Sequence, residues 1–178
     1  RVLAEAFGKD APEVFAKTKA IKIVACGTSY HAGLVSRYWI ESFTGLPCNV
    51  EVASEYRYRK HVVPEGALFV TISQSGETAD TLAALRMAKD LGYAKTLAIC
   101  NAPESSLVRE SDLVFLTHAG PEIGVASTKA FTTQLVSLLL LTSAIGRYNG
   151  LDQDTEAARV ALLRSLPGKI EEALGMDE

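Results

Sequence analysis

The sequence predicts an α/β domain in which a five-stranded parallel sheet lies between layers of helices. Five short runs rich in Val, Ile and Leu alternate along the chain with longer segments that carry helical periodicity. The runs are continuously apolar instead of alternating between apolar and polar residues, which is typical of parallel strands covered on both faces. Alternation of this kind indicates a doubly wound sheet.

Five segments are expected to form the strands of this sheet. Each is five or six residues long, the usual length of a strand in a globular protein. The predicted strands are residues 21–25, 49–53, 67–72, 95–100 and 112–116.

The segments between and after the strands are expected to be helices. Stop signals stand at Gly45 and Gly92, Asp152 is a suitable N-cap, and Pro167 is expected to interrupt the last long helix. The predicted helices are residues 12–18, 30–43, 78–91, 128–148 and 152–166, with short helices after the loop 101–105 and over 168–174.

Composition limits the class of protein. A chain of 178 residues with 48% apolar and 22% charged residues fits a single globular domain, 1–178, and its start at Arg1 suggests a fragment of a longer chain. The net charge of −3 argues against nucleic acid as a partner, and the longest apolar run, 138–141, is too short for a membrane span. Three widely spaced cysteines favour a reducing cytoplasm over a disulfide framework or a zinc site.

The segment Ser73–Thr78 is the strongest functional signal. Ser73, Gln74, Ser75 and Thr78 stand where a predicted strand gives way to a helix, and spare backbone N–H groups and the helix dipole suit a phosphate there. Gly76 is expected to let the backbone approach a ligand closely. The loop has no Lys or Arg, so neutral donors would hold the anion. The alternative is that these hydroxyls only cap the helix.

A second strand-to-helix turn, Gly27–Ser29, is expected to face this loop. In a sheet of order 2-1-3-4-5, ligands bind between the carboxyl ends of the first and third strands, which here lead into residues 26–29 and 73–76. Thr28 could bind sugar hydroxyls, and Ser29 could cap the next helix. Cys26 is expected to be a buried, inert thiol.

A third turn, residues 124–129, follows the fifth strand. Ser127 and the backbone near Val125 could contact a ligand. Lys129 could be catalytic, but a lysine in such a position is more often solvated or structural.

The three histidines show no metal-binding spacing, and the chain lacks the glycine patterns of dinucleotide-binding domains and phosphate-binding loops. The residues themselves therefore indicate neither a metal nor an organic cofactor.

Four segments together resemble a known family. Residues 25–33, 53–58, 73–81 and 122–134 are similar, in this order, to the first sugar isomerase (SIS) lobe of the glutamine:fructose-6-phosphate amidotransferases. The serine loop alone would indicate only the sugar isomerase superfamily. The similarity extends from about residue 21 to residue 174.

The resemblance implies a flavodoxin-like three-layer sandwich that binds the phosphate of fructose 6-phosphate or glucose 6-phosphate. It maps the phosphate loop onto Ser73, Gln74, Ser75 and Thr78, the sugar-contacting turn onto Thr28, and the third turn onto Val125 and Ser127. It implies no metal and no cofactor, a homodimer, and two partners in the parent chain, which are a glutaminase domain and a second SIS lobe.

The family's catalytic lysine, acid and histidine belong to the second lobe or the tail of the parent enzyme. This chain is therefore expected to contain no catalytic residue and to bind sugar phosphate without converting it. Two alternatives stay open, namely a non-catalytic SIS regulator that senses sugar phosphates and a flavodoxin-type mononucleotide binder.

Overall fold

The computed structural model describes residues 2–123 and 127–177 and confirms the predicted α/β class. Five parallel strands form one sheet in the order β2-β1-β3-β4-β5. The strands are β1 (Ala20–Ala25), β2 (Cys48–Val52), β3 (Ala67–Ser73), β4 (Lys95–Cys100) and β5 (Leu113–Leu116). The sheet therefore has the order that the sequence analysis used to bring the first and third strand ends together.

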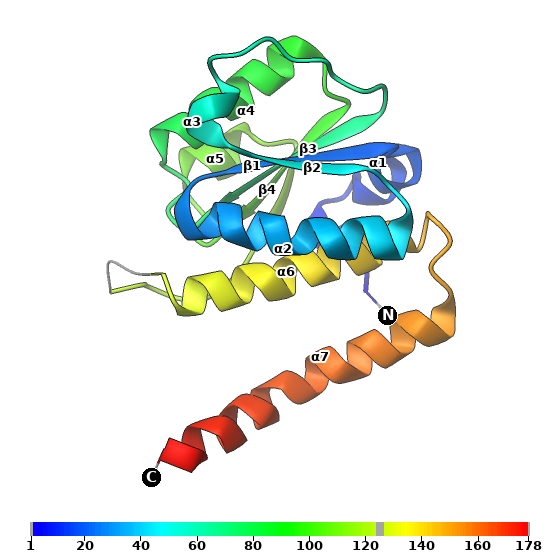
Figure 1. Ribbon diagram of the computed structural model, residues 1–178, viewed down its shortest axis with the longest axis vertical. Coiled ribbons are helices and arrows are strands. Elements are labelled where there is room, and N and C mark those ends of the chain that lie inside the picture. Colours follow the sequence, from blue (N-terminus) through cyan, green and yellow to red (C-terminus); the bar gives the residue numbers. More distant parts are fainter. Residues whose placement is uncertain (1, 124–126, 178) are drawn as a thin grey trace.

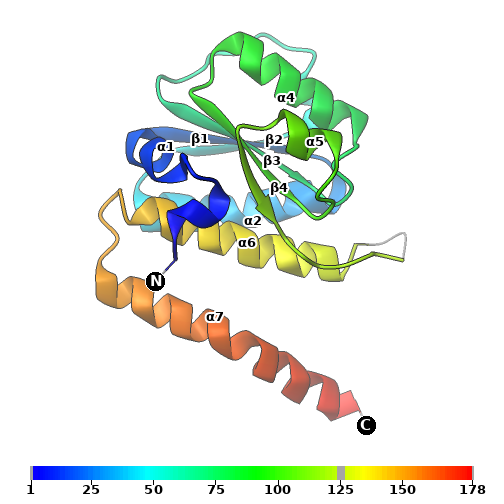
Figure 2. The ribbon, with the colours of Figure 1, turned by 180° about the vertical axis from the view of Figure 1, so that it is seen from behind.

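Helices cover both faces of the sheet, which makes three layers (Figures 1 and 2). One face packs against α2 (Gly27–Thr44) and α6 (Lys129–Gly146), with α1 (Ala11–Lys17) and the 3₁₀ turn η1 (Ala4–Phe7) beside them. The other face packs against α3 (Ala53–Tyr56), α4 (Ala79–Leu91) and α5 (Ser106–Glu110). Each face has its own cluster of buried apolar side chains, as expected for strands that are apolar on both sides.

By length and composition alone, helix α6 is long and apolar enough to cross a membrane. The sequence analysis considered only the short apolar run 138–141 within it and did not anticipate this. More than half of it (56%) is buried inside the protein. It packs along α2, where Leu138, Leu141 and Ile145 have no exposed surface. Its apolar composition is thus accounted for by burial between neighbouring elements, as in the core helix of a globular domain.

Helix α7 (Gln153–Leu174) corrects one expectation, because it runs unbroken through Pro167. Proline removes one N–H donor from a helix and leaves the carbonyl four residues earlier without its usual partner. Pro167 is exposed, as are most residues around it, so water can hydrate the carbonyl that the proline leaves unpaired. The helix diverges from the body of the domain towards the C-terminus (Figure 1), and the turn η2 (Gly175–Asp177) follows it.

Candidate functional site

The register of the sheet brings the first two predicted loops together. Ala25 pairs with Ile72, so the turn that starts at Cys26 and the loop that starts at Ser73 leave neighbouring strands at the same height. A cavity of about 400 Å³ opens between them. Its lining is composed of Cys26, Gly27, Thr28, Ser29, Ile72, Ser73, Gln74, Ser75, Thr78, Thr81 and Ser127.

Six of the seven site residues expected from the sequence line this one cavity. They are Thr28, Ser73, Gln74, Ser75, Thr78 and Ser127, and the seventh, Val125, lies outside the described residues. No Lys, Arg, His, Asp or Glu appears among the described lining residues. A bound anion would thus meet hydroxyls, an amide and the N-terminal ends of α2 and α4, which carry partial positive charge.

The serine hydroxyls stabilise their own loop and still keep a proton to donate. Ser73 Oγ accepts a hydrogen bond from the Gly76 N–H at 2.9 Å, and Ser75 Oγ accepts one from the Glu77 N–H at 3.2 Å. A hydroxyl that accepts through a lone pair retains its O–H for another partner. Local hydrogen bonding and ligand binding are therefore compatible in these serines. Thr78 stands at the N-cap of α4 but makes no side-chain capping bond.

Gly76 is required by a close contact that the sequence did not reveal. Its φ is +67°, and a Cβ on it would lie 2.1 Å from Ser105 Oγ and 2.4 Å from Ser105 Cβ. The closest neighbour on the side of the missing Cβ is thus Ser105, just before α5, and not the cavity. The Glu77 carboxylate reinforces this contact by accepting a hydrogen bond from the Ser106 N–H at 2.7 Å, which lowers the pKa of Glu77. The loop is therefore fastened to the start of α5.

The turn Gly27–Ser29 forms the first turn of α2, which begins three residues earlier than predicted. Thr28 is exposed to the cavity, and Ser29 is buried at its edge. Ser29 does not cap α2, since its Oγ accepts a hydrogen bond from Gln134 Nε2 of α6 at 3.0 Å. Cys26, which we expected to be buried, is half-buried and lines the cavity.

The segment after β5 is held by a residue that the sequence analysis assigned only to a loop. Asn101 Oδ1 accepts hydrogen bonds from Thr117 Oγ1 at 3.1 Å and the Ala119 N–H at 2.8 Å, and its Nδ2 donates to the Gly120 carbonyl at 2.9 Å. These bonds fix the path of the chain from the end of β5 to Gly120. Only local turn chemistry was visible at Asn101, because its partners lie 16 to 19 residues away.

Two residues near the predicted turns, Lys129 and His31, stay outside the cavity. Both are exposed, and neither belongs to the described lining. In the described part of the chain, no group of three or more His, Cys, Asp or Glu is placed to hold a metal ion.

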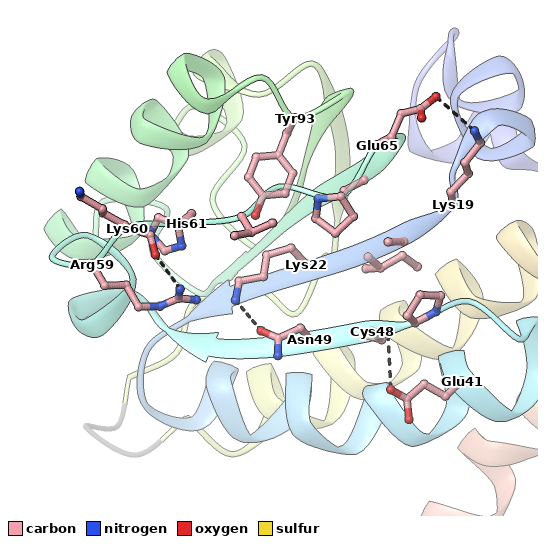
Figure 3. Close-up of a pocket in the computed structure, with 16 residues that line it drawn as sticks. Lys19, Lys22, Glu41, Cys48, Asn49, Arg59, Lys60, His61, Glu65 and Tyr93 are labelled. Atoms are coloured by element: carbon pink, nitrogen blue, oxygen red, sulfur yellow. Dashed lines mark hydrogen bonds and ion pairs between the residues drawn. The ribbon is translucent and has the colours of Figure 1, made fainter.

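A larger hollow of about 580 Å³ lies over β1 and β2, beneath the segment 57–66 (Figure 3). Lys22 and Arg59 line it, and both donate to the Glu51 carboxylate at 2.5 Å, Lys22 through Nζ and Arg59 through Nη2. Arg59 first and then Lys22 hold the pKa of Glu51 at about 2, whereas burial lowers the pKa of Lys22. These charges are paired with one another, so size alone does not make this hollow the better candidate site.

Comparison with known proteins gives a consistent family. The model of the SIS domain family matches residues 14–144. The glutamine–fructose-6-phosphate aminotransferase (isomerizing) of Pseudomonas syringae pv. tomato is 66% identical over 178 residues, which are 99% of this chain and 29% of that protein. The Escherichia coli enzyme of the same name is 58% identical over 171 residues, 96% of this chain and 28% of that protein. The chain therefore spans less than a third of the length of these relatives.

A solved structure agrees with the sequence comparison. The C-terminal domain of glucosamine-fructose-6-phosphate aminotransferase from Francisella tularensis superposes with a TM-score of 0.93 and 52% identity, over 99% of this chain and 51% of that one. The family match extends from α1 into α6, so it includes all five strands and every described residue that lines the cavity. The chain therefore belongs to the SIS domain family.

Proposed function

We propose that this chain is the sugar-phosphate-binding lobe of the isomerase half of a glutamine–fructose-6-phosphate aminotransferase. The observation that carries the proposal is the neutral cavity at the ends of β1 and β3, where hydroxyls from two loops meet the N-termini of α2 and α4. Its lining suits a phosphate monoester attached to a polyol. Identity of 66% to the aminotransferase of Pseudomonas syringae, over nearly the whole chain, supports this activity for the parent protein.

The phosphate would bind at the loop Ser73–Thr78. Ser73, Gln74, Ser75 and Thr78 supply side-chain donors, and the N-terminus of α4 supplies the positive end of the helix dipole. The sugar would extend towards Thr28 and Ser127 on the facing turns. Val125 stays a site residue expected from the sequence. Such a site discriminates by the geometry of its donors, because the described lining carries no formal charge.

The chain alone is proposed to bind the sugar phosphate and not to convert it. Amino transfer and isomerisation require groups that take up and release protons. Cys26 is the sole titratable side chain in the described lining. The acid and base groups would come from a second SIS lobe, and ammonia would come from a glutaminase domain of the same parent. We propose residues 1–178 as a single SIS domain of a cytoplasmic homodimer.

Calorimetric titration with fructose 6-phosphate, glucose 6-phosphate, free fructose and inorganic phosphate tests the proposal. We expect heat of binding from the sugar phosphates and none from free fructose, since the phosphate provides the anchor. If none of the four binds, the titration is repeated with the second lobe supplied as part of the parent chain. If no binding is detected in that experiment either, sugar-phosphate binding by this cavity is refuted.

Ser75→Ala is expected to weaken sugar-phosphate binding by about 1–3 kcal/mol, roughly 5- to 150-fold in Kd, the scale of a hydrogen bond to a charged group. Ser75 is exposed, so the fold should survive. Ser165→Ala is the matched control, because Ser165 is also exposed but its hydroxyl donates to the Leu162 carbonyl on α7. An unchanged affinity in folded Ser75→Ala would remove this residue from the site.

Cys26 provides a chemical probe of the cavity. We expect saturating fructose 6-phosphate to protect its thiol from iodoacetamide, because ligand and reagent would occupy the same space. Cys48 and Cys100 are internal controls, since both are buried and burial raises the pKa of Cys48 to about 12. Mass spectrometry of the alkylated peptides separates the three sites. Equal labelling of Cys26 with and without bound ligand would contradict the placement.

A further inference from the structure

Gln134 is a buried polar side chain whose amide nitrogen has a hydrogen-bond partner and whose amide oxygen has none among the described residues. It lies on α6 with 1% of its surface exposed, and its Nε2 donates to Ser29 Oγ of α2. Its Oε1 is buried and has no partner among the described residues. A buried polar atom without a partner lowers the stability of a fold, so its presence calls for a reason other than packing.

The other buried polar residues of α6 behave differently. Ser137, Thr142 and Ser143 each donate to the carbonyl four residues earlier in their own helix, at 2.7 to 2.9 Å. They are satisfied locally and need nothing from the rest of the protein. Gln134 instead reaches across to a residue 105 positions away, in the first turn of α2. An apolar side chain at this position would suit the interface between α2 and α6 without leaving an unpaired carbonyl.

The hydrogen bond from Gln134 fixes the role of the Ser29 hydroxyl. Ser29 Oγ accepts from Gln134, and the hydrogen bonds found in the described part of the chain give its own proton no acceptor. Ser29 is 7% exposed and lines the cavity. With its lone pair engaged on the side of α6, the hydroxyl can direct its O–H into the cavity.

We propose that Gln134 is a positioning residue of the sugar-phosphate site, which holds the Ser29 hydroxyl and the turn around Thr28 in a ligand-ready arrangement. This inference rests on the proposed function, because the ligand is the sugar phosphate. It explains why a polar side chain with an unpaired oxygen is retained in the core, since functional sites commonly keep groups that do not favour stability.

The test combines stability and binding for Gln134→Leu. We expect a melting temperature close to that of the wild type, because the variant removes the unpaired carbonyl, and the Ser29 hydroxyl that loses its donor lies at the cavity, where water can reach it. The affinity for fructose 6-phosphate should fall by about 3- to 10-fold. A purely structural residue would show lower stability with unchanged affinity. Gln134→Met, which keeps an unbranched side chain, provides the same measurement if Gln134→Leu does not fold. Thr142→Val is the matched control on the same helix, with unchanged affinity expected.

A double-mutant cycle with Ser29→Ala shows whether Gln134 acts through Ser29. We expect Gln134→Leu to have no further effect on affinity once Ser29 is alanine. Wild-type affinity in folded Gln134→Leu, or the same loss with and without the Ser29 hydroxyl, would overturn the inference. A wild-type chain that binds no sugar phosphate, alone or with the second lobe, would instead refute the proposed function. The two failures are therefore distinguishable.

Discussion

Gly76→Ala is expected to destabilise the domain by about 3 kcal/mol or more, through steric conflict at the phosphate loop. Gly76 has a φ of +67°, where residues with a Cβ are strained. The new Cβ would also lie 2.1 Å from Ser105 Oγ and 2.8 Å from Cys100 Sγ. Ser105 is 5% exposed and has little room to move. Urea unfolding gives the change in the free energy of unfolding.

Gly92→Ala is the matched control, because it separates backbone strain from crowding. Gly92 also has a positive φ, +84°, but a Cβ on it would meet no atom within 4 Å. Its substitution should therefore cost only the strain of the left-handed backbone, about 1–2 kcal/mol. Adding Ser105→Gly to Gly76→Ala should recover part of the difference. If Gly76→Ala is no less stable than Gly92→Ala, the contact with Ser105 does not determine the loop.

Binding should respond even more sharply than stability to Gly76→Ala. Ser73 Oγ receives its hydrogen bond from the Gly76 N–H, so displacement of Gly76 moves the hydroxyl that is proposed to meet the phosphate. The same displacement disturbs the bond between Glu77 and the Ser106 N–H. We expect loss of detectable sugar-phosphate binding under conditions where circular dichroism shows a folded domain, whereas folded Gly92→Ala should bind as the wild type does.

The parts of the fold that follow from local pattern could be predicted from the sequence. All five strands were found because parallel strands buried on both faces are continuously apolar. The meeting of the two loops was predicted because the first and third strands are neighbours in the expected strand order. The bond between Gln134 and Ser29 and the contact between Gly76 and Ser105 join residues distant in the chain, and no local pattern encodes them. Pro167 was misread because its effect depends on exposure, which the sequence does not reveal.

Lys22 shows a further limit of pattern reading. It stands inside an apolar strand and is 7% exposed, and an isolated charge in such a place would be very costly. The sequence gives no sign of its partners, Asn49 and Glu51, which become its neighbours only when β2 pairs with β1. The charge is tolerated because strand pairing provides the carboxylate.

Glu51→Gln should therefore be the second severe substitution, with an expected loss of about 3 kcal/mol at pH 7, because removing one member of a buried ion pair leaves the other charge uncompensated. Glu51 is 16% exposed at its side chain and joins Lys22 to Arg59. Glu65→Gln is the control, since Glu65 is 91% exposed at its side chain and pairs with Lys19 at 3.3 Å. Exposed pairs of that kind contribute no more than about 1 kcal/mol. Equal effects of the two substitutions in urea unfolding would contradict the importance of the buried cluster.

The pH dependence of the Glu51→Gln effect identifies its electrostatic origin. The pKa of Glu51 falls from its usual 4.5 to about 2 in the folded protein, so its contribution is complete above pH 4.5. As the pH decreases from 4.5 towards 2, the unfolded chain takes up the proton first and the contribution is lost. The difference in unfolding free energy between wild type and Glu51→Gln should shrink over this window. A difference that stays constant would mean that packing, and not charge, accounts for the loss. Adding Lys22→Met to Glu51→Gln should then restore stability at pH 7, because it removes the charge that Glu51 neutralised.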